Sequence, residues 1–183
     1  MDLQLKGTTL TEEDVSAADA IVRAVGKHNR NAVHQRELIV LTSDINDIRA
    51  LRIRVSKTYH RALGWCWPAG YRNNGTLKRA IWIKRGQERA DDIDTLVHEL
   101  CHGYAGLTIS HEMSFRRFVT MSYYAVLCDP HFIDDCPLAE NIDDYMFRWA
   151  LGICTRYQRV THHDPYEAER SLQAAQRFVR VTL

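Results

Sequence analysis

The chain has 183 residues, and its 24 Lys and Arg against 23 Asp and Glu leave a net charge of only +1. This length favours one domain over residues 1–183 with a core that needs no disulfide staples, and the charge balance excludes a global attraction to nucleic acid or anionic membranes. The five cysteines include no C-x-x-C pair, which predicts reduced thiols and excludes a disulfide framework or a cysteine zinc ribbon.

No segment approaches 18 consecutive apolar residues, and residues 1–11 lack the basic flank and apolar run of a signal peptide. We therefore expect a cytoplasmic protein that does not contact a membrane.

The first third of the chain predicts two helices with a strand between them. Thr11-Glu12-Glu13-Asp14 is typical of a capping box, which opens a helix to about residue 28. Residues 37–42 form a short apolar run that favours a buried strand. Ser43 or Asp44 then caps a second helix to about residue 63. Its solvent face carries five cations, which indicate either an ordinary solvated face or a nucleic-acid surface: Arg49, Arg52, Arg54, Lys57 and Arg61.

Residues 63–85 predict a strand, a turn and a second strand. The apolar run at 64–67 ends at Pro68, and Gly and Asn in residues 69–75 favour a loop. Residues 77–84 predict a strand of period two with one largely apolar face, because Leu77, Arg79, Ile81 and Ile83 alternate with Lys78, Ala80, Trp82 and Lys84. This second strand is either internal or an edge strand whose backbone could pair with an extended peptide.

The next helix, residues 91–106, carries the sequence His98-Glu99-Leu100-Cys101-His102. Residues four apart lie on one side of a helix, so the two imidazoles point to one place with Glu99 beside them. A shuffled chain of this composition would contain H-E-x-x-H roughly two times in a hundred. The pattern predicts a Zn²⁺ site with Glu99 as general base, and a buried structural pair of histidines is the alternative.

Three further helices are predicted after the motif. They cover residues 112–128, 138–159, and a last segment that begins at Asp164-Pro165, where Asp caps and Pro takes the first helical position. No repeat or long linker interrupts them.

A catalytic zinc normally takes three protein ligands and a water, so the two motif histidines need a third partner. His111 is the leading candidate because it lies nine residues past His102, beyond two glycines and at the entry to the next helix. Glu167 and Glu169 on the last helix are the rivals. A metzincin would need histidine at position 108, where Thr108 stands.

The motif together with His111-x-x-x-Phe115-Arg116 resembles the SprT-like metalloprotease domain, which includes the Spartan proteases. The resemblance covers about residues 37–128, with a helical C-terminal part at about 138–183. Glu112 stands where that family has glycine, and the family's C-terminal zinc ribbon has no counterpart. The segment 164–170 is similar to an N-P-x-E-x-E-A stretch of other small zincin-like proteins, which keeps Glu167 and Glu169 as possible ligands.

This resemblance implies an α+β zincin-like fold, with a small mixed sheet, helices packed on it and the motif on an active-site helix. It implies a zinc metallopeptidase in which His98, His102 and His111 bind the metal and Glu99 moves the proton of a metal-activated water. The implied substrates are proteins or peptides, in the family proteins associated with DNA. Two alternatives stay open: a catalytically silent zincin-fold accessory protein, nucleic-acid-associated or phage-type, and a metal-free structural domain.

Overall fold

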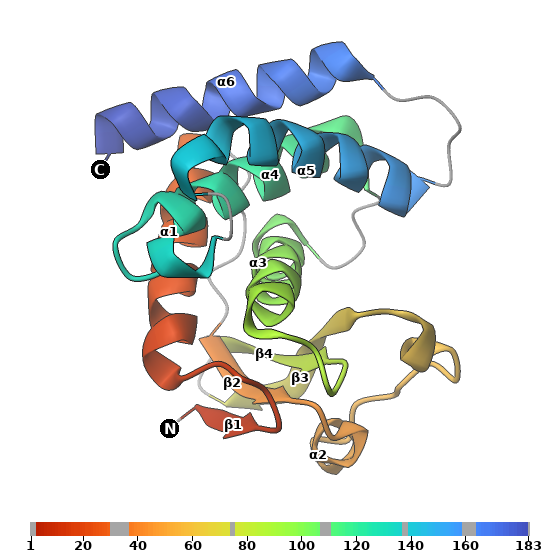
Figure 1. Ribbon diagram of the computed structural model, residues 1–183. Coiled ribbons are helices and arrows are strands. Elements are labelled where there is room, and N and C mark those ends of the chain that lie inside the picture. The colour runs from red at the N-terminus through yellow and green to blue at the C-terminus, as the bar shows by residue number, and fades with distance from the viewer. Residues whose placement is uncertain are drawn as a thin grey trace.

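A computed structural model describes residues 3–29, 37–73, 76–106, 111–136, 139–158 and 164–182. Within these ranges the side chains of residues 68–73, 76–77, 139 and 153–158 are not described. The fold is α+β (Figure 1). The strands are β1 (Gln4–Lys6), β2 (Glu37–Thr42), β3 (Gly64–Asn73) and β4 (Thr76–Ile83). The helices are α1 (Glu12–His28), α2 (Ile45–Ala50), α3 (Arg89–Ala105), α4 (Met113–Cys128), α5 (Ile142–Gln158) and α6 (Pro165–Thr182).

The four strands form one mixed sheet in the order β1-β2-β4-β3. β1 and β2 are parallel, β2 and β4 are parallel, and β3 is antiparallel to β4. β4 is therefore internal, so the idea that residues 77–84 form an edge strand is wrong. β3 is the edge strand on that side of the sheet.

β3 continues well beyond its predicted end. Pro68 pairs with Arg79, and the strand runs on to Asn73 through residues that favoured a loop. An edge strand tolerates proline because the missing N–H can be on the unpaired side. The tertiary pairing with β4 thus overrides the local turn signal.

The second predicted helix is much shorter than expected. Asp44 caps α2 as predicted, and its side chain accepts a hydrogen bond from the backbone N–H of Asn46 at 2.9 Å. The helix ends at Ala50, and Arg52 has a φ of 59°. The prediction of a helix to residue 63 is wrong because Leu51, Ile53 and Val55 bury one side of an irregular chain.

Most other elements lie where the sequence placed them. The capping box of α1 is confirmed, since the N–H of Asp14 donates to Thr11 Oγ1 at 3.2 Å and the N–H of Thr11 donates to Asp14 Oδ2 at 2.6 Å. β2 has its predicted bounds, α4 begins just after Glu112, and α6 begins at Pro165. The predicted helix 138–159 opens with a 3₁₀ turn, Ala139–Asn141, before α5.

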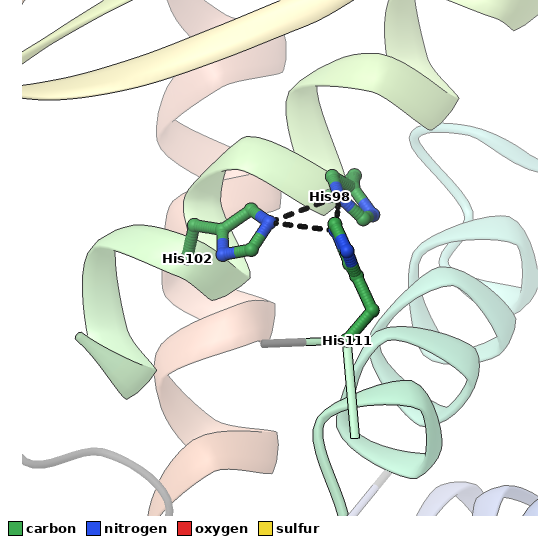
Figure 2. Close-up of side chains that lie close together, drawn as sticks. All are labelled: His98, His102 and His111. Carbon is green, nitrogen blue, oxygen red and sulfur yellow. Dashed lines mark hydrogen bonds between the residues drawn. The ribbon is translucent and has the colours of Figure 1, made fainter. Parts of the chain in front are cut away.

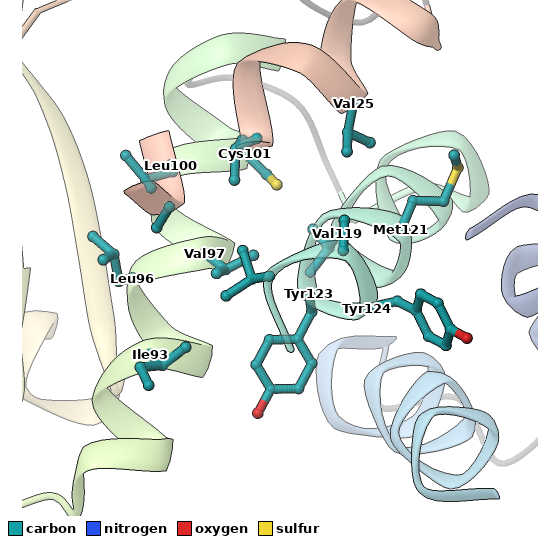
Figure 3. Close-up of a cluster of buried hydrophobic side chains, with 14 of the residues drawn as sticks. Val25, Ile93, Leu96, Val97, Leu100, Cys101, Val119, Met121, Tyr123 and Tyr124 are labelled. Carbon is teal, nitrogen blue, oxygen red and sulfur yellow. The ribbon is translucent and has the colours of Figure 1, made fainter. Parts of the chain in front are cut away.

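The two faces of the sheet bury separate hydrophobic clusters. Ile81 and Ile83 face a large core that α3 shares with α1, α4 and the C-terminal helices. Figure 3 shows the part of this core in which side chains of α3 and α4 meet. Ala80 and Trp82 face the opposite way and pack with Ile48 of α2. Figure 1 accordingly shows α3 between the sheet and the other long helices, with α2 on the far side of the sheet.

A buried ion cluster joins α1, β4 and α3. The Arg79 side chain is fully buried, forms a salt bridge with Asp19 and lies 4.6 Å from the ring centre of Tyr104. Tyr104 also donates to Asp19 at 2.9 Å. Gly103 makes room for the guanidinium, because a Cβ there would lie 2.4 Å from Arg79 Nη1. Gly103 is thus a packing residue inside α3, whereas Gly106, with φ 104°, is its C-cap.

In the described part of the chain, no helix has both the length and the apolar character that a membrane crossing requires. The four cysteines with described side chains, Cys66, Cys101, Cys128 and Cys136, are all free thiols.

We predict that Gly103→Ala destabilises the protein although alanine favours helices. The new methyl group must displace the buried Arg79 guanidinium, an overpacking cost of about 1–3 kcal/mol against a helix-propensity gain of about 1 kcal/mol. Gly152→Ala in α5 is the matched control, because among the described residues no atom beyond its chain neighbours and its own helix backbone lies within 4 Å of its Cβ position. It should stabilise by about 0.5–1 kcal/mol. Urea unfolding midpoints measure both, and equal effects would contradict this role of Gly103.

Candidate metal centre

Three histidine side chains converge between α3 and the start of α4. His98 and His102 lie one turn apart on α3, and His111 immediately precedes Glu112, the N-cap of α4. Each pair of their Nε2 atoms is 3.1 Å apart (Figure 2). The structure therefore brings together the three residues that the sequence singled out as metal ligands.

The spacing of these nitrogens suits a zinc ion. In a tetrahedral site with Zn–N distances of about 2.0–2.1 Å, two ligand nitrogens lie about 3.3–3.4 Å apart. The observed 3.1 Å is within a few tenths of an ångström of that value. Three protein nitrogens leave the fourth position open, as catalytic zinc sites do.

The chemistry of imidazole also favours a cation at this point. Each ring nitrogen offers either one N–H or one lone pair along a single direction. Three Nε2 atoms at equal short distances cannot all find a hydrogen-bond partner in one another, because at least two lone pairs must then face each other. A cation accepts all three lone pairs together.

The direction of the pKa shifts of two of the candidate ligands points the same way. Burial lowers the pKa of His102 to about 3, with a smaller contribution from His111. Burial, followed by the positive charge of Arg116, also lowers the pKa of His111. Metal ligation requires neutral imidazole, so these two side chains are in the binding form at neutral pH.

Phe115 holds the rings of the histidine cluster in place. It stacks on His102 with ring centres 4.3 Å apart and lies edge-on to His98 at 5.6 Å and to His111 at 5.5 Å. No described residue hydrogen-bonds to the buried Nδ1 of His102. Packing therefore sets the orientation of the His102 ring. In many metal sites, a hydrogen bond from the other ring nitrogen of the histidine does this instead.

Arg116 is a residue of this site that the sequence analysis quoted without assigning it a role. Its side chain is only 3% exposed, and its Nε donates to the backbone carbonyl of His111 at 2.7 Å. This bond ties the non-helical residue His111 to the first turn of α4. The five-residue spacing from a candidate ligand to a buried arginine is the signal that could have identified it.

The side chain of Glu99 extends from α3 toward the edge strand β3. Its side chain is 6% exposed, and burial raises its pKa to about 8, while a hydrogen bond from the backbone of Cys66 opposes that shift. Gly64 allows this close approach: a Cβ there would lie 2.4 Å from Thr95 Cγ2 and 3.0 Å from Glu99 Cγ. Sequence reasoning missed Gly64 because the need for glycine comes from a helix thirty residues later.

The rival carboxylates have other partners. Glu167 accepts hydrogen bonds from Arg117 at 3.2 Å and from Arg170 at 2.9 Å, which joins α6 to α4. Glu169 is exposed and accepts a hydrogen bond from Gln173. Within the described part of the chain, the histidine trio is the group of side chains arranged to hold a metal ion.

Comparison with known proteins adds no assignment: no family model, curated protein or solved structure matches this chain.

We predict that the protein, purified without chelators, holds about one equivalent of zinc. His98→Ala, His102→Ala and His111→Ala should each reduce this to below about a tenth, whereas His60→Ala, at an exposed site, should not. Chelation should lower the thermal midpoint of the wild type on the order of 5–10 °C. Elemental analysis and thermal unfolding measure these effects, and a wild type without zinc would contradict the assignment.

We also predict a pH-dependent stability difference between the metal-free wild type and Glu99→Gln. A folded-state pKa of about 8 lies above the ordinary value of 4.5, so the folded protein binds the extra proton between these pH values. The free energy of unfolding of the wild type should therefore fall relative to the variant as pH rises from about 5 to 8. The limiting slope is about 1.4 kcal/mol per pH unit. Urea unfolding with a chelator at several pH values measures it, and parallel curves would contradict the shift.

Proposed function

We propose that this chain is a zinc-dependent peptidase with a zincin-like active site, akin to the SprT-like proteases. The observation that carries the proposal is the meeting of three imidazole nitrogens at 3.1 Å beside a buried glutamate of the same helix. Structural zinc sites are closed by four protein ligands, whereas three ligands and an adjacent carboxylate suit hydrolysis.

Zinc bound by His98, His102 and His111 would acidify a water and polarise a substrate carbonyl. The carboxylate of Glu99 would accept the proton of the attacking water and deliver it to the leaving amine. A cation beside the glutamate favours its ionised form, which offsets the effect of burial on the pKa. The hydrogen bond from the backbone of Cys66 keeps the carboxylate in one orientation.

The edge strand β3 would hold the substrate. An edge strand presents unpaired backbone donors and acceptors, with which an extended peptide can pair with little dependence on sequence. Gly64 and Cys66 of β3 lie against Glu99, so a peptide paired along this strand would run beside the general base. The strand that would pair with a peptide is thus β3, whereas residues 77–84 lie in the internal strand β4.

One observation favours the catalytically silent alternative, in which the metal serves structure alone. Glu99 is 6% exposed and bonded to the backbone of β3, as a purely structural glutamate would be. The two functions differ in turnover, and zinc content does not separate them.

We predict that Glu99→Gln retains zinc but loses peptidase activity by a factor on the order of 10²–10⁴, because glutamine cannot take the proton. Cleavage of casein and of a DNA-bound protein measures activity, and elemental analysis measures zinc. Glu88→Gln, an exposed change just before α3 that breaks no described side-chain bond, is the control. Activity that survives in Glu99→Gln would rule out the mechanism, and a zinc-loaded wild type without turnover would establish the silent alternative.

We further predict that Gly64→Ala lowers activity without removing zinc, because the added methyl group must push Thr95 and Glu99 away from β3. Thr95→Ser removes the Cγ2 atom with the closest contact, at 2.4 Å. The double variant Gly64→Ala/Thr95→Ser should therefore recover part of the lost activity. Additive losses in this double-mutant cycle would show that Gly64 does not act through that contact.

A further inference from the structure

Positive charge is concentrated on the outer side of the sheet, away from the metal centre. Residues 49–61 include no Asp or Glu, and the backbone N–H of Lys84 donates to the carbonyl of Leu63 at 2.8 Å, which brings Lys84 next to a residue just past the end of this segment. We call this surface the basic face. Its cations are Arg49, Arg52, Arg54, Lys57, Arg61, Lys84 and Arg85. It thus collects seven of the 24 cations of a chain whose net charge is only +1.

The cations of the basic face lack acidic partners. All seven are exposed, and none forms a salt bridge with a residue that the structure describes. Some arginines elsewhere do form salt bridges with carboxylates, namely Arg23, Arg79, Arg89, Arg117, Arg148 and Arg170. Among the described residues, the basic face thus has no carboxylate within ion-pair distance of its cations, which raises the local potential for an anionic ligand.

The backbone of this segment explains why the charges point outward. Leu51, Ile53 and Val55 pack onto the outer cluster of the sheet, and the residues between them, Arg52 and Arg54, are exposed. The alternation of partly buried and exposed side chains over residues 51–55 thus leaves these two arginines on the solvent side.

Two half-buried aromatic rings belong to the same part of the fold as the basic face. Tyr59 packs edge-on against Trp82 with ring centres 5.1 Å apart, and Trp65 stacks on Trp67 at 5.7 Å. Trp65 and Trp82 are register partners on β3 and β4, so these rings form one group. Half-exposed rings beside cations are what single-stranded nucleic acids use: bases stack on the rings while phosphates meet the charges.

We propose that the basic face binds single-stranded nucleic acid. Duplex bases are already stacked on one another and cannot use Tyr59 or Trp65, and an acidic peptide has no planar base to place there. A membrane-binding surface needs several protruding apolar side chains. In the described part of residues 49–67, Leu63, 42% exposed, is the single large apolar side chain that is exposed. The proposal is independent of peptidase activity, since it concerns binding on the opposite side of the sheet.

The test measures binding of the full chain to a fluorescent oligothymidine of about 15 nucleotides by anisotropy over a range of salt concentrations. The logarithm of the affinity should fall with the logarithm of salt by about 0.7 for each phosphate contacted. Arg52→Gln/Arg54→Gln/Lys57→Gln should weaken binding at least about tenfold and reduce the slope by about 2. The control Lys27→Gln/Arg177→Gln/Arg180→Gln makes the same charge change at exposed positions of α1 and α6 and should leave both unchanged.

Stacking is tested by Trp65→Leu, which should weaken binding on the order of tenfold with an unchanged salt slope. Should this variant fail to fold, the binding affinities of Tyr59→Leu and of the two charge variants still test the proposal. A duplex of the same length, an oligoglutamate peptide and phosphatidylserine vesicles are measured alongside. Binding to any of these as tight as to the single strand, no binding to the single strand, or equal losses in the two charge variants would overturn the proposal.

Discussion

The close approach of α3 to the sheet is the constraint on which both the fold and the candidate site depend. Two glycines permit this approach, one on each side of the interface. Gly64 on β3 leaves space for Thr95 and Glu99 of α3, and Gly103 on α3 leaves space for Arg79 of β4. With any side chain at these positions the helix would move away from the strands. Glu99 would then leave the backbone of Cys66, and the histidines of α3 would leave the N-terminus of α4.

The buried charge of Arg79 is held by residues that are far away in the sequence. Arg79, fully buried on β4, is compensated by Asp19 of α1 and Tyr104 of α3. An uncompensated buried guanidinium would be very costly, so this cluster requires the three elements to assemble together. The C-terminal end of α3, where Tyr104 lies two residues after His102, is anchored as a result.

Local signals predicted much of this structure. The capping box of α1, the period of β4 and the four-residue spacing of His98 and His102 depend only on residues near in sequence, and all lie in the elements expected. The sequence could predict that His111 lies near His102, because the connection after the glycine that ends α3 is short. What failed was decided by distant partners: β3 runs past Pro68 because β4 pairs with it, and α2 stops early because the sheet offers Leu51 and Ile53 an apolar surface. Gly64 gave no signal, since its role is defined by contacts with a helix far away in the sequence, whereas the five-residue spacing of Arg116 from His111 was a local signal that was not used.

Four residues of β3 face alternately toward two different surfaces. Gly64 and Cys66 face α3 and Glu99, while Trp65 and Trp67 face the outer cluster. A slip of one residue between β3 and β4 would exchange these sets, placing indole rings against Glu99 and a glycine on the outer side. Such a slip would damage both surfaces together, so a single strand register keeps the candidate metal centre and the aromatic group in their places.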